Sequence, residues 1–285
     1  MPMHPAAPDD LPAMLEAFEQ TASAVVDLGM SCRDADFERE TECPGWTVQD
    51  QIAHLVGAEK RLAGAPTPRA EVTDRPYIRN KNGLINEQDV EARRQLPGQE
   101  VVAELAAYLP QRMAQLRGEP SLDVVVGGVH GPDTTLREHL THRILETWCH
   151  EQDVRAALDR PGDLDTPAAA VFTAAVLDAL PRVVAIDTGV SPGHAVILDV
   201  TGPLLARDGV RVCVGDDGQP CAEPLFSGHD RPDGDEPDDV TTIHLTTEAL
   251  TRRAAGRRTS EEITYTVTGD GSTARAVLDA LTIVQ

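Results

Sequence analysis

Glu146 and His150 lie four positions apart in a segment with the apolar spacing of a long helix. Residues four apart project from the same helix face one turn apart, so the carboxylate and the imidazole can share one ligand. Zinc accepts both imidazole nitrogen and carboxylate oxygen, and a catalytic zinc site has three protein ligands with one open position. His54, on a neighbouring predicted helix, is the candidate third ligand.

Two further histidines, His139 and His142, lie on nearby faces of the same predicted helix. Either could replace a ligand or support one from outside the metal's own shell. A Glu-x-x-x-His pair is also common on solvent-facing helices, and an isolated histidine is usually an ordinary core or surface residue. The spacing alone therefore leaves the metal site open.

The elements that must position these residues are helices. Apolar residues recur at helical spacing, and Thr47 with Asp50 is typical of an N-terminal capping box. Thr134 or Thr135 can cap the helix that carries Glu146 and His150, and Pro161-Gly162 ends it. The predicted helices cover residues 11–30, 47–62, 86–96, 98–117, 135–158 and 166–186. We expect residues 1–188 to form one helical metal-binding domain.

After Gly189 the pattern changes to short apolar runs, with Asp208-Gly209 as a hairpin signal. We expect strands at residues 195–200, 210–214, 240–245 and 262–268 and helices at 247–255 and 272–281. This order predicts a small α+β domain over residues 189–285. The acidic loop at residues 227–239 lacks the spacing of an EF-hand and is more simply a solvated linker than a calcium site.

Composition excludes some partners. The 285 residues carry a formal charge of -22, which disfavours nucleic acid because phosphate binding needs clustered Lys and Arg. The five cysteines form an odd set without a CxxC pair, so no disulfide framework is expected. The first eleven residues lack the pattern of a signal peptide, and no run approaches eighteen apolar residues. We expect a soluble cytoplasmic protein without a membrane partner, and the charge permits a monomer.

An acidic substrate would need local arginines to overcome this global charge. Arg252 and Arg253, with Arg257 and Arg258, cluster near the end of a predicted helix, where they could bind carboxylates. The alternative, which we prefer, is interaction with the negative end of that helix. Arg143 could pair with Glu146 or face a cleft. These three arginines, Arg143, Arg252 and Arg253, are the candidate catalytic residues.

Other conspicuous side chains favour packing roles. Cys149 is adjacent to His150, but neighbouring helical positions point about 100° apart, so burial is expected. Cys43 is expected to pack at a helix entry. Trp46 and Trp148 are expected to anchor the core.

Three blocks of sequence resemble the mycothiol-dependent maleylpyruvate isomerase family. Residues 43–55 read CPGWTVQDQIAHL, similar to a turn that leads into a helix presenting a histidine followed by leucine. The second block resembles the family's arginine, glutamate, histidine and aspartate-valine motif. Its residues here are Arg143, Glu146, Trp148, His150, Asp153 and Val154. Residues 267–281 resemble the end of the family's sterol-carrier-like domain.

This resemblance implies a DinB-like four-helix bundle that holds a divalent metal, usually zinc, through His54, Glu146 and His150. It also implies mycothiol as a thiol cosubstrate and a small electrophile as substrate. The enzyme would be a cis-trans isomerase or a thiol S-transferase. The alternative is a non-catalytic binding module, in which His142 or His139 closes the metal site as a fourth ligand.

Overall fold

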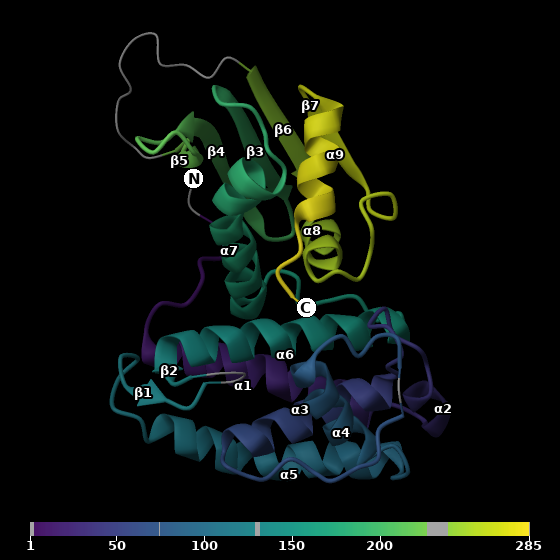
Figure 1. Ribbon diagram of the computed structural model, residues 1–285. Coiled ribbons are helices and arrows are strands. Elements are labelled where there is room, and N and C mark those ends of the chain that lie inside the picture. Colours follow the sequence, from purple (N-terminus) through teal and green to yellow (C-terminus); the bar gives the residue numbers. More distant parts are fainter. Residues whose placement is uncertain (1–2, 74, 129–131, 227–238, 285) are drawn as a thin grey trace. The chain divides into compact units, whose positions relative to one another are not determined.

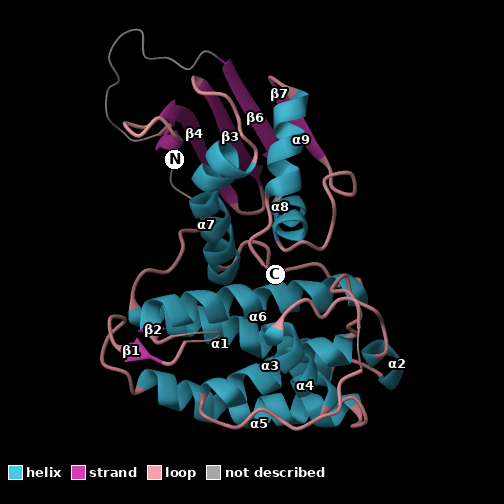
Figure 2. Cartoon of the chain, in the orientation of Figure 1, coloured by secondary structure: helices cyan, strands magenta, loops and turns pink. Residues whose placement is uncertain are grey.

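The computed structural model describes residues 3–73, 75–128, 132–226 and 239–284, which form two compact units (Figure 1). One unit is Pro8–Gly162, and the other combines Met1–Ala7 with Asp163–Gln285. The first consists almost entirely of helices, and the second joins helices to a sheet (Figure 2). Most of the predicted acidic loop, residues 227–238, lies outside the described residues.

The division between the units differs from the expected boundary at residues 188 and 189. Helix α7, Pro167–Arg182, and the π-helix η1, Val183–Asp187, belong to the mixed unit. There α7 packs against β4, β5 and α8. The sequence pattern of an apolar helix shows that it is buried but does not show which core it joins, and only the packing groups α7 with the sheet.

The helical unit follows the predicted order with small additions. Its elements are α1 Leu11–Met30, α2 Asp34–Phe37, α3 Val48–Leu62, α4 Lys81–Glu91, α5 Gly98–Arg117, β1 Val125–Val126, β2 Thr134–Thr135 and α6 Leu136–Leu158. Helix α4 begins five residues earlier than expected because Asn80 caps it, accepting a hydrogen bond from the Gly83 amide at 2.9 Å.

Helices α3 and α6 bring the candidate site into the core of this unit. Helix α1 packs against α5 and α6, and α3 packs against α4, α5 and α6. Fully buried aliphatic side chains, among them Val25, Ile52, Val102 and Val154, fill the space between them. Burial of such side chains is the main stabilising contribution to the packing.

Capping interactions determine where these two helices begin. The Thr47 hydroxyl accepts from the Asp50 amide at 3.3 Å, and the Asp50 carboxylate accepts from the Thr47 amide at 3.1 Å. Thr135 and Glu138 make the same reciprocal pair at the start of α6. Both predicted caps are confirmed. Of Thr134 and Thr135, it is Thr135 that caps α6.

The mixed unit contains a five-stranded sheet in the order β5-β4-β3-β6-β7. The strands are β3 His194–Thr201, β4 Leu205–Val214, β5 Pro220–Pro224, β6 Asp239–Leu245 and β7 Tyr265–Thr268. Helices α7, α8 Thr247–Ala254 and α9 Gly271–Ala280 lie on one side of the sheet (Figure 2). Strands β3 and β6 are parallel, whereas the other neighbours are antiparallel.

Strands β3 and β4 form an antiparallel hairpin, but the predicted place of its turn was wrong, because Asp208 and Gly209 both lie inside β4. A Cβ at Gly209 would lie 3.0 Å from the Ile197 side chain and 3.1 Å from the Val196 carbonyl oxygen. The glycine therefore allows close packing within the sheet rather than a turn. The signal misled because glycine serves both purposes.

The cysteines also depart from expectation. Cys213 and Cys221 face each other across β4 and β5 and form a disulfide. Spacing along the chain did not reveal the pair because β5 was not predicted, and strand register decides which residues are opposite.

One segment, Pro167–Asp187, is long and apolar enough to cross a membrane by length and composition alone. It consists of α7 and η1, and more than half of it is buried inside the unit. The core helix of a folded domain passes the same test, and the sheet contacts of α7 account for its apolar character.

Candidate functional site

His54, Glu146 and His150 come together in the interior of the helical unit. His54 extends from α3, and the other two extend from α6. One potential ligand atom from each residue lies within 4.8 Å of the others, and all three residues are buried. Two histidines and one carboxylate therefore form a compact donor set.

The three side chains contact one another and one aromatic ring. His54 Nε2 lies 2.9 Å from Glu146 Oε1, and the two imidazole centroids are 4.8 Å apart. The Trp46 ring lies 5.0 Å from that of His54 and 5.9 Å from that of His150. The Trp46 indole N–H donates to Glu87 at 2.9 Å. Trp46 is thus a buried wall of the cluster.

A buried charged network holds Glu146. Arg143 donates to Glu146 Oε2 and, at 2.7 Å, to Glu59 Oε1. Glu59 Oε2 accepts from Arg112 at 2.9 Å. Burial raises the pKa of Glu146, but the charge of Arg143 and the hydrogen bond from His54 outweigh this and hold the pKa well below its usual range. Glu146 is therefore ionised.

His139 belongs to this network rather than to the donor cluster. Its Nε2 lies 2.9 Å from Arg112 Nη2, and its Nδ1 lies 3.3 Å from the Gly127 carbonyl oxygen. Both ring nitrogens are engaged. His142 lies differently, with Nδ1 3.5 Å from Glu146 Oε2 and a side chain that is 44% exposed. Of the two histidines considered, His142 is the one beside the cluster.

His150 is oriented from outside the cluster. Its Nδ1 lies 2.5 Å from Gln51 Oε1 and 3.7 Å from Asp153 Oδ2. Burial lowers the pKa of His150 to about 4, and the Asp153 carboxylate only partly opposes this. At neutral pH His150 is a neutral imidazole, the protonation state that can bind a metal.

Asp89 and Gly57 adjoin His54. The Nδ1 atom of His54 and the Oδ1 atom of Asp89 are both buried without a hydrogen-bond partner. Burial raises the pKa of Asp89, and the charges of Arg61 and His54 only partly oppose this. Gly57, three residues after His54, admits the Asp89 side chain, because a Cβ there would lie 2.2 Å from the Asp89 carboxyl carbon. The other carboxylate oxygen accepts from Arg61 at 2.7 Å.

The candidate catalytic arginines lie in two places. Arg143 is fully buried and, of the two alternatives considered, pairs with Glu146. Arg252 and Arg253 lie on α8 in the mixed unit and are buried. Arg253 donates to the Leu278 carbonyl at 2.5 Å and to the Asp279 carbonyl at 2.7 Å. It thereby caps the C-terminal end of α9 rather than of α8, the helix expected from sequence.

The packing roles expected for the other conspicuous residues are confirmed in part. Cys149 and Trp148 are fully buried, and Trp46 is 9% exposed. Cys43 is half-buried at the turn before α3. Trp46 differs from a simple core residue because it covers both histidines.

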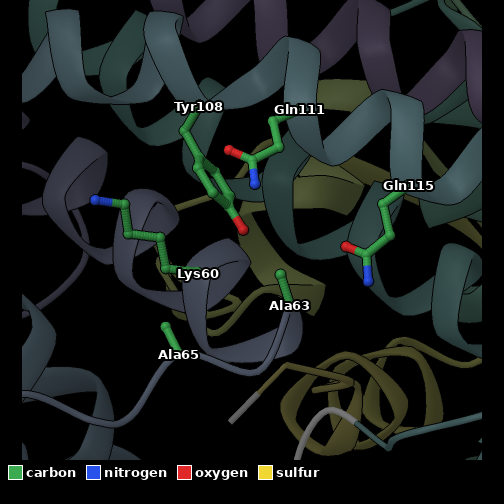
Figure 3. A pocket seen from close by; sticks show the side chains of 6 residues that line it. All are labelled: Lys60, Ala63, Ala65, Tyr108, Gln111 and Gln115. Atoms are coloured by element: carbon green, nitrogen blue, oxygen red, sulfur yellow. The ribbon is translucent and has the colours of Figure 1, made fainter.

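A separate pocket of about 550 Å³ opens on the same unit (Figure 3). Tyr108, Gln111 and Gln115 line one side from α5, and Lys60, Ala63 and Ala65 line the other from the end of α3 and the loop beyond it. None of the three cluster residues lines it. Gln115 accepts a hydrogen bond from Arg112 at 2.9 Å, so the pocket borders the charged network.

Sequence reasoning missed the residues that support the cluster, chiefly Gln51, Glu59, Asp89 and Arg112. Each is less than 4% exposed. Gln51 and Glu59 lie on the predicted helix of His54, and a polar residue on its apolar face was the available signal. Asp89 and Arg112 lie on other helices, where nothing in the spacing connects them to the site.

Residues 18–155 match the family described as the mycothiol maleylpyruvate isomerase N-terminal domain. This range contains all three cluster residues. No curated protein sequence matches the chain.

Two solved structures resemble most of the chain. A crystal structure of a histidine-to-alanine variant of mycothiol-dependent maleylpyruvate isomerase is 16% identical, with a TM-score of 0.53, and the likeness covers 90% of this chain and 92% of that one. The crystal structure of mycothiol-dependent maleylpyruvate isomerase itself is 17% identical with the same coverage and a TM-score of 0.49. The first likeness establishes a shared fold. Residues 18–155 thus form a domain of the mycothiol maleylpyruvate isomerase N-terminal family.

Proposed function

We propose that the protein is a divalent-metal-dependent enzyme that uses mycothiol to isomerise or conjugate a small electrophile. The observation that carries this proposal is the gathering of His54, Glu146 and His150 within 4.8 Å inside a domain of this family. We further infer a DinB-like four-helix arrangement, zinc as the metal and a cytoplasmic location.

The residues fit such a metal on chemical grounds. Two imidazoles and one carboxylate are a donor set of catalytic zinc sites, which leave a further position open. Within the described part of the chain the donor group has three members, in keeping with an open position. The carboxylate is ionised through Arg143, and His150 is neutral, so both are in the protonation state that binds a cation.

A bound divalent cation would lower the pKa of a thiol that binds beside it, so that the thiol reacts as a thiolate. In an isomerase, that sulfur would add to a conjugated cis double bond, the new single bond would rotate, and elimination would release the trans product and the thiol. In an S-transferase, the sulfur would stay on the electrophile. The three cluster residues serve either outcome.

The arginines take different parts in this proposal. Arg143 lies against Glu146 and would hold the carboxylate in place. Arg252 and Arg253 remain candidates for binding the carboxylates of a substrate, although Arg253 donates to carbonyl oxygens of its own unit. If Arg253 has only a structural role, Arg253→Ala will lower the melting temperature without changing KM for an anionic electrophile.

The test combines metal analysis with binding. Wild type, the double variant His54→Ala, His150→Ala and the control His244→Ala, which lies on β6 in the other unit, would be purified and analysed for zinc. Each would then be titrated calorimetrically with mycothiol. We expect about one zinc and saturable thiol binding in wild type and the control, and neither in the double variant.

Wild type that binds zinc but not mycothiol would rule out both the isomerase and the S-transferase. The non-catalytic binding module would then take their place, with His142 as the fourth donor beside Glu146. His142→Asn separates these functions, because it would weaken zinc binding only if His142 closes the site. His139 is a poorer fourth donor since both of its ring nitrogens are engaged.

A further inference from the structure

Gln51 makes a short hydrogen-bond contact with Nδ1 of His150. It lies on α3, one turn before His54, and is fully buried. Its Oε1 is 2.5 Å from His150 Nδ1, and its Nε2 donates to Thr41 Oγ1 at 2.7 Å. One amide therefore joins a candidate ligand to the segment before α3.

The hydroxyl of Thr41 decides which way this amide points. It donates its single proton to the Trp46 carbonyl oxygen at 2.8 Å and accepts from the Cys43 amide at 3.2 Å. With its proton committed, Thr41 can only accept from Gln51. The amide nitrogen of Gln51 must face Thr41, and the amide oxygen must face His150.

The orientation of Gln51 determines the tautomer of His150. A carbonyl oxygen can only accept, so Nδ1 of His150 must carry the proton. The Asp153 carboxylate, 3.7 Å from the same nitrogen, favours the same tautomer. In a neutral imidazole with its proton on Nδ1, the lone pair is on Nε2, which is the atom left to bind a metal.

The turn before α3 is built to hold Thr41 in place. The Thr41 amide donates to the Trp46 carbonyl at 3.0 Å, and the Trp46 amide donates to the Cys43 carbonyl at 3.1 Å. Gly45 has a φ of +79°, and a Cβ there would lie 2.1 Å from the Tyr77 ring. The turn thus requires glycine for both its backbone conformation and its packing.

From these contacts we propose that Thr41 and Gln51 are positioning residues, which fix the Nδ1–H tautomer of His150 and present its Nε2 to the divalent cation. The proposal rests on the metal site proposed above. It also gives the Cys-Pro-Gly-Trp turn a purpose: the turn supports a hydrogen-bond relay from its own backbone through Thr41 and Gln51 to the ligand.

The first test is the tautomer itself, which needs neither metal nor substrate. Imidazole ¹⁵N NMR spectra of the metal-free wild type at neutral pH should show His150 with its proton on Nδ1. A wild-type spectrum with the proton on Nε2 would overturn the proposal. This readout also holds if the protein binds no zinc, so it distinguishes a failure of the relay from a failure of the proposed function.

The second test measures metal affinity by competition of Zn²⁺ with a chelator. Gln51→Met keeps the size of the side chain but removes the acceptor, and we expect about 10- to 100-fold weaker binding together with a mixed His150 tautomer. Gln51→Glu restores an acceptor and should recover the Nδ1–H tautomer and most of the affinity. Thr41→Val should weaken binding less than Gln51→Met, because it removes only the partner of the Gln51 amide nitrogen and leaves the acceptor oxygen of Gln51 beside His150.

A matched control lies on the same helix. Gln49 donates to the carbonyl of Leu96 at 2.9 Å and does not contact His150. Gln49→Met should therefore leave both tautomer and affinity unchanged. If Gln51→Met binds Zn²⁺ as tightly as wild type and keeps the Nδ1–H tautomer, Gln51 is only a packing residue and the proposal fails.

Discussion

Helices α6 and α7 follow each other in the chain, yet α6 buries many polar side chains among its apolar ones, whereas α7 buries almost only apolar side chains. Buried polar or charged residues on α6 are His139, Arg143, Glu146, Thr147, His150, Glu151, Gln152 and Asp153. On α7 the buried residues are Ala, Val, Phe and Leu, with Thr173 as the exception. Both helices belong to a core, so burial alone does not explain the difference.

Helix α6 therefore buries charge at a cost in stability that α7 does not have. Burying ionised groups costs free energy unless each is paired, and well-packed apolar groups of similar size are often as stable or more so. The α7 pattern follows from packing alone. On α6, Arg143 and Glu146 are retained at a cost, and the candidate metal donors are their neighbours. A buried charged network is thus the feature that separates the site from ordinary core.

The sharpest way to break this comparison is to remove the central arginine. Arg143→Met leaves the buried carboxylates of Glu59 and Glu146 without a shared cation, and we expect a loss of about 3–5 kcal/mol in unfolding free energy. Urea denaturation measures it. The control Arg117→Met removes an ion pair with Glu19 whose side chains are 53% and 40% exposed, and it should cost less than about 1 kcal/mol. Equal losses of unfolding free energy in the two variants would mean that the buried Arg143 ion pairs contribute no more than an exposed pair.

Helix α7 offers the apolar counterpart. Leu180 is fully buried, so Leu180→Ala should cost about 2–5 kcal/mol through lost contacts and a cavity. Because no metal donor is involved, thermal melts with and without zinc should show the same loss. Ile186→Ala, at a position that is 60% exposed, should change stability by less than about 0.5 kcal/mol. A zinc-dependent effect of Leu180→Ala would contradict the division between the helices.

The charged network also predicts a pH dependence. Burial, with the charges of Arg112 and Arg143, lowers the pKa of His139 to about 4, against about 6.5 in an unfolded chain. Between these values the unfolded state binds more protons, so stability is full above pH 6.5 and falls as the pH drops to 4. One such group accounts for at most about 3 kcal/mol.

His139→Gln isolates this contribution, because glutamine can accept from Arg112 and donate to Gly127 without titrating. Unfolding free energies of metal-free protein between pH 4 and 7 should fall less steeply in the variant than in wild type. Parallel curves would show that His139 is not held neutral by its surroundings.

The smallest expected effect concerns the space beside His54. In Gly57→Ala the new Cβ would lie 2.2 Å from the Asp89 carboxyl carbon, so Asp89 must move, at a cost of about 1–3 kcal/mol. Gly83→Ala is the matched helical control, since the nearest atom would be 3.7 Å away and the change should be neutral or stabilise by up to about 1 kcal/mol. A stable Gly57→Ala variant would show that Asp89 is not tightly placed against α3.

Several parts of this structure could be predicted from sequence because their causes are local. The capping box of Thr47 and Asp50 places the start of α3, and the four-residue spacing of Glu146 and His150 places both on one face of α6. His54, the candidate third ligand, lies on α3, and the resemblance to the isomerase family supported its choice. The turn predicted at Asp208-Gly209 was misplaced because glycine also serves close packing within a strand, and the Cys213–Cys221 pair depends on strand register.

Sequence patterns alone thus predict the main helices, the helix faces that carry the donors and the resemblance to the isomerase family. The contacts of His54 with Glu146, of Arg143 and Arg112 with Glu59, of Gln51 with His150 and of α7 with the sheet are seen only in the folded protein. Capping and helical periodicity act within a few residues, so they can be read along the chain. Hydrogen bonds such as the one between Gln51 and His150, which lie 99 residues apart in the chain, arise only when packing brings separate helices together.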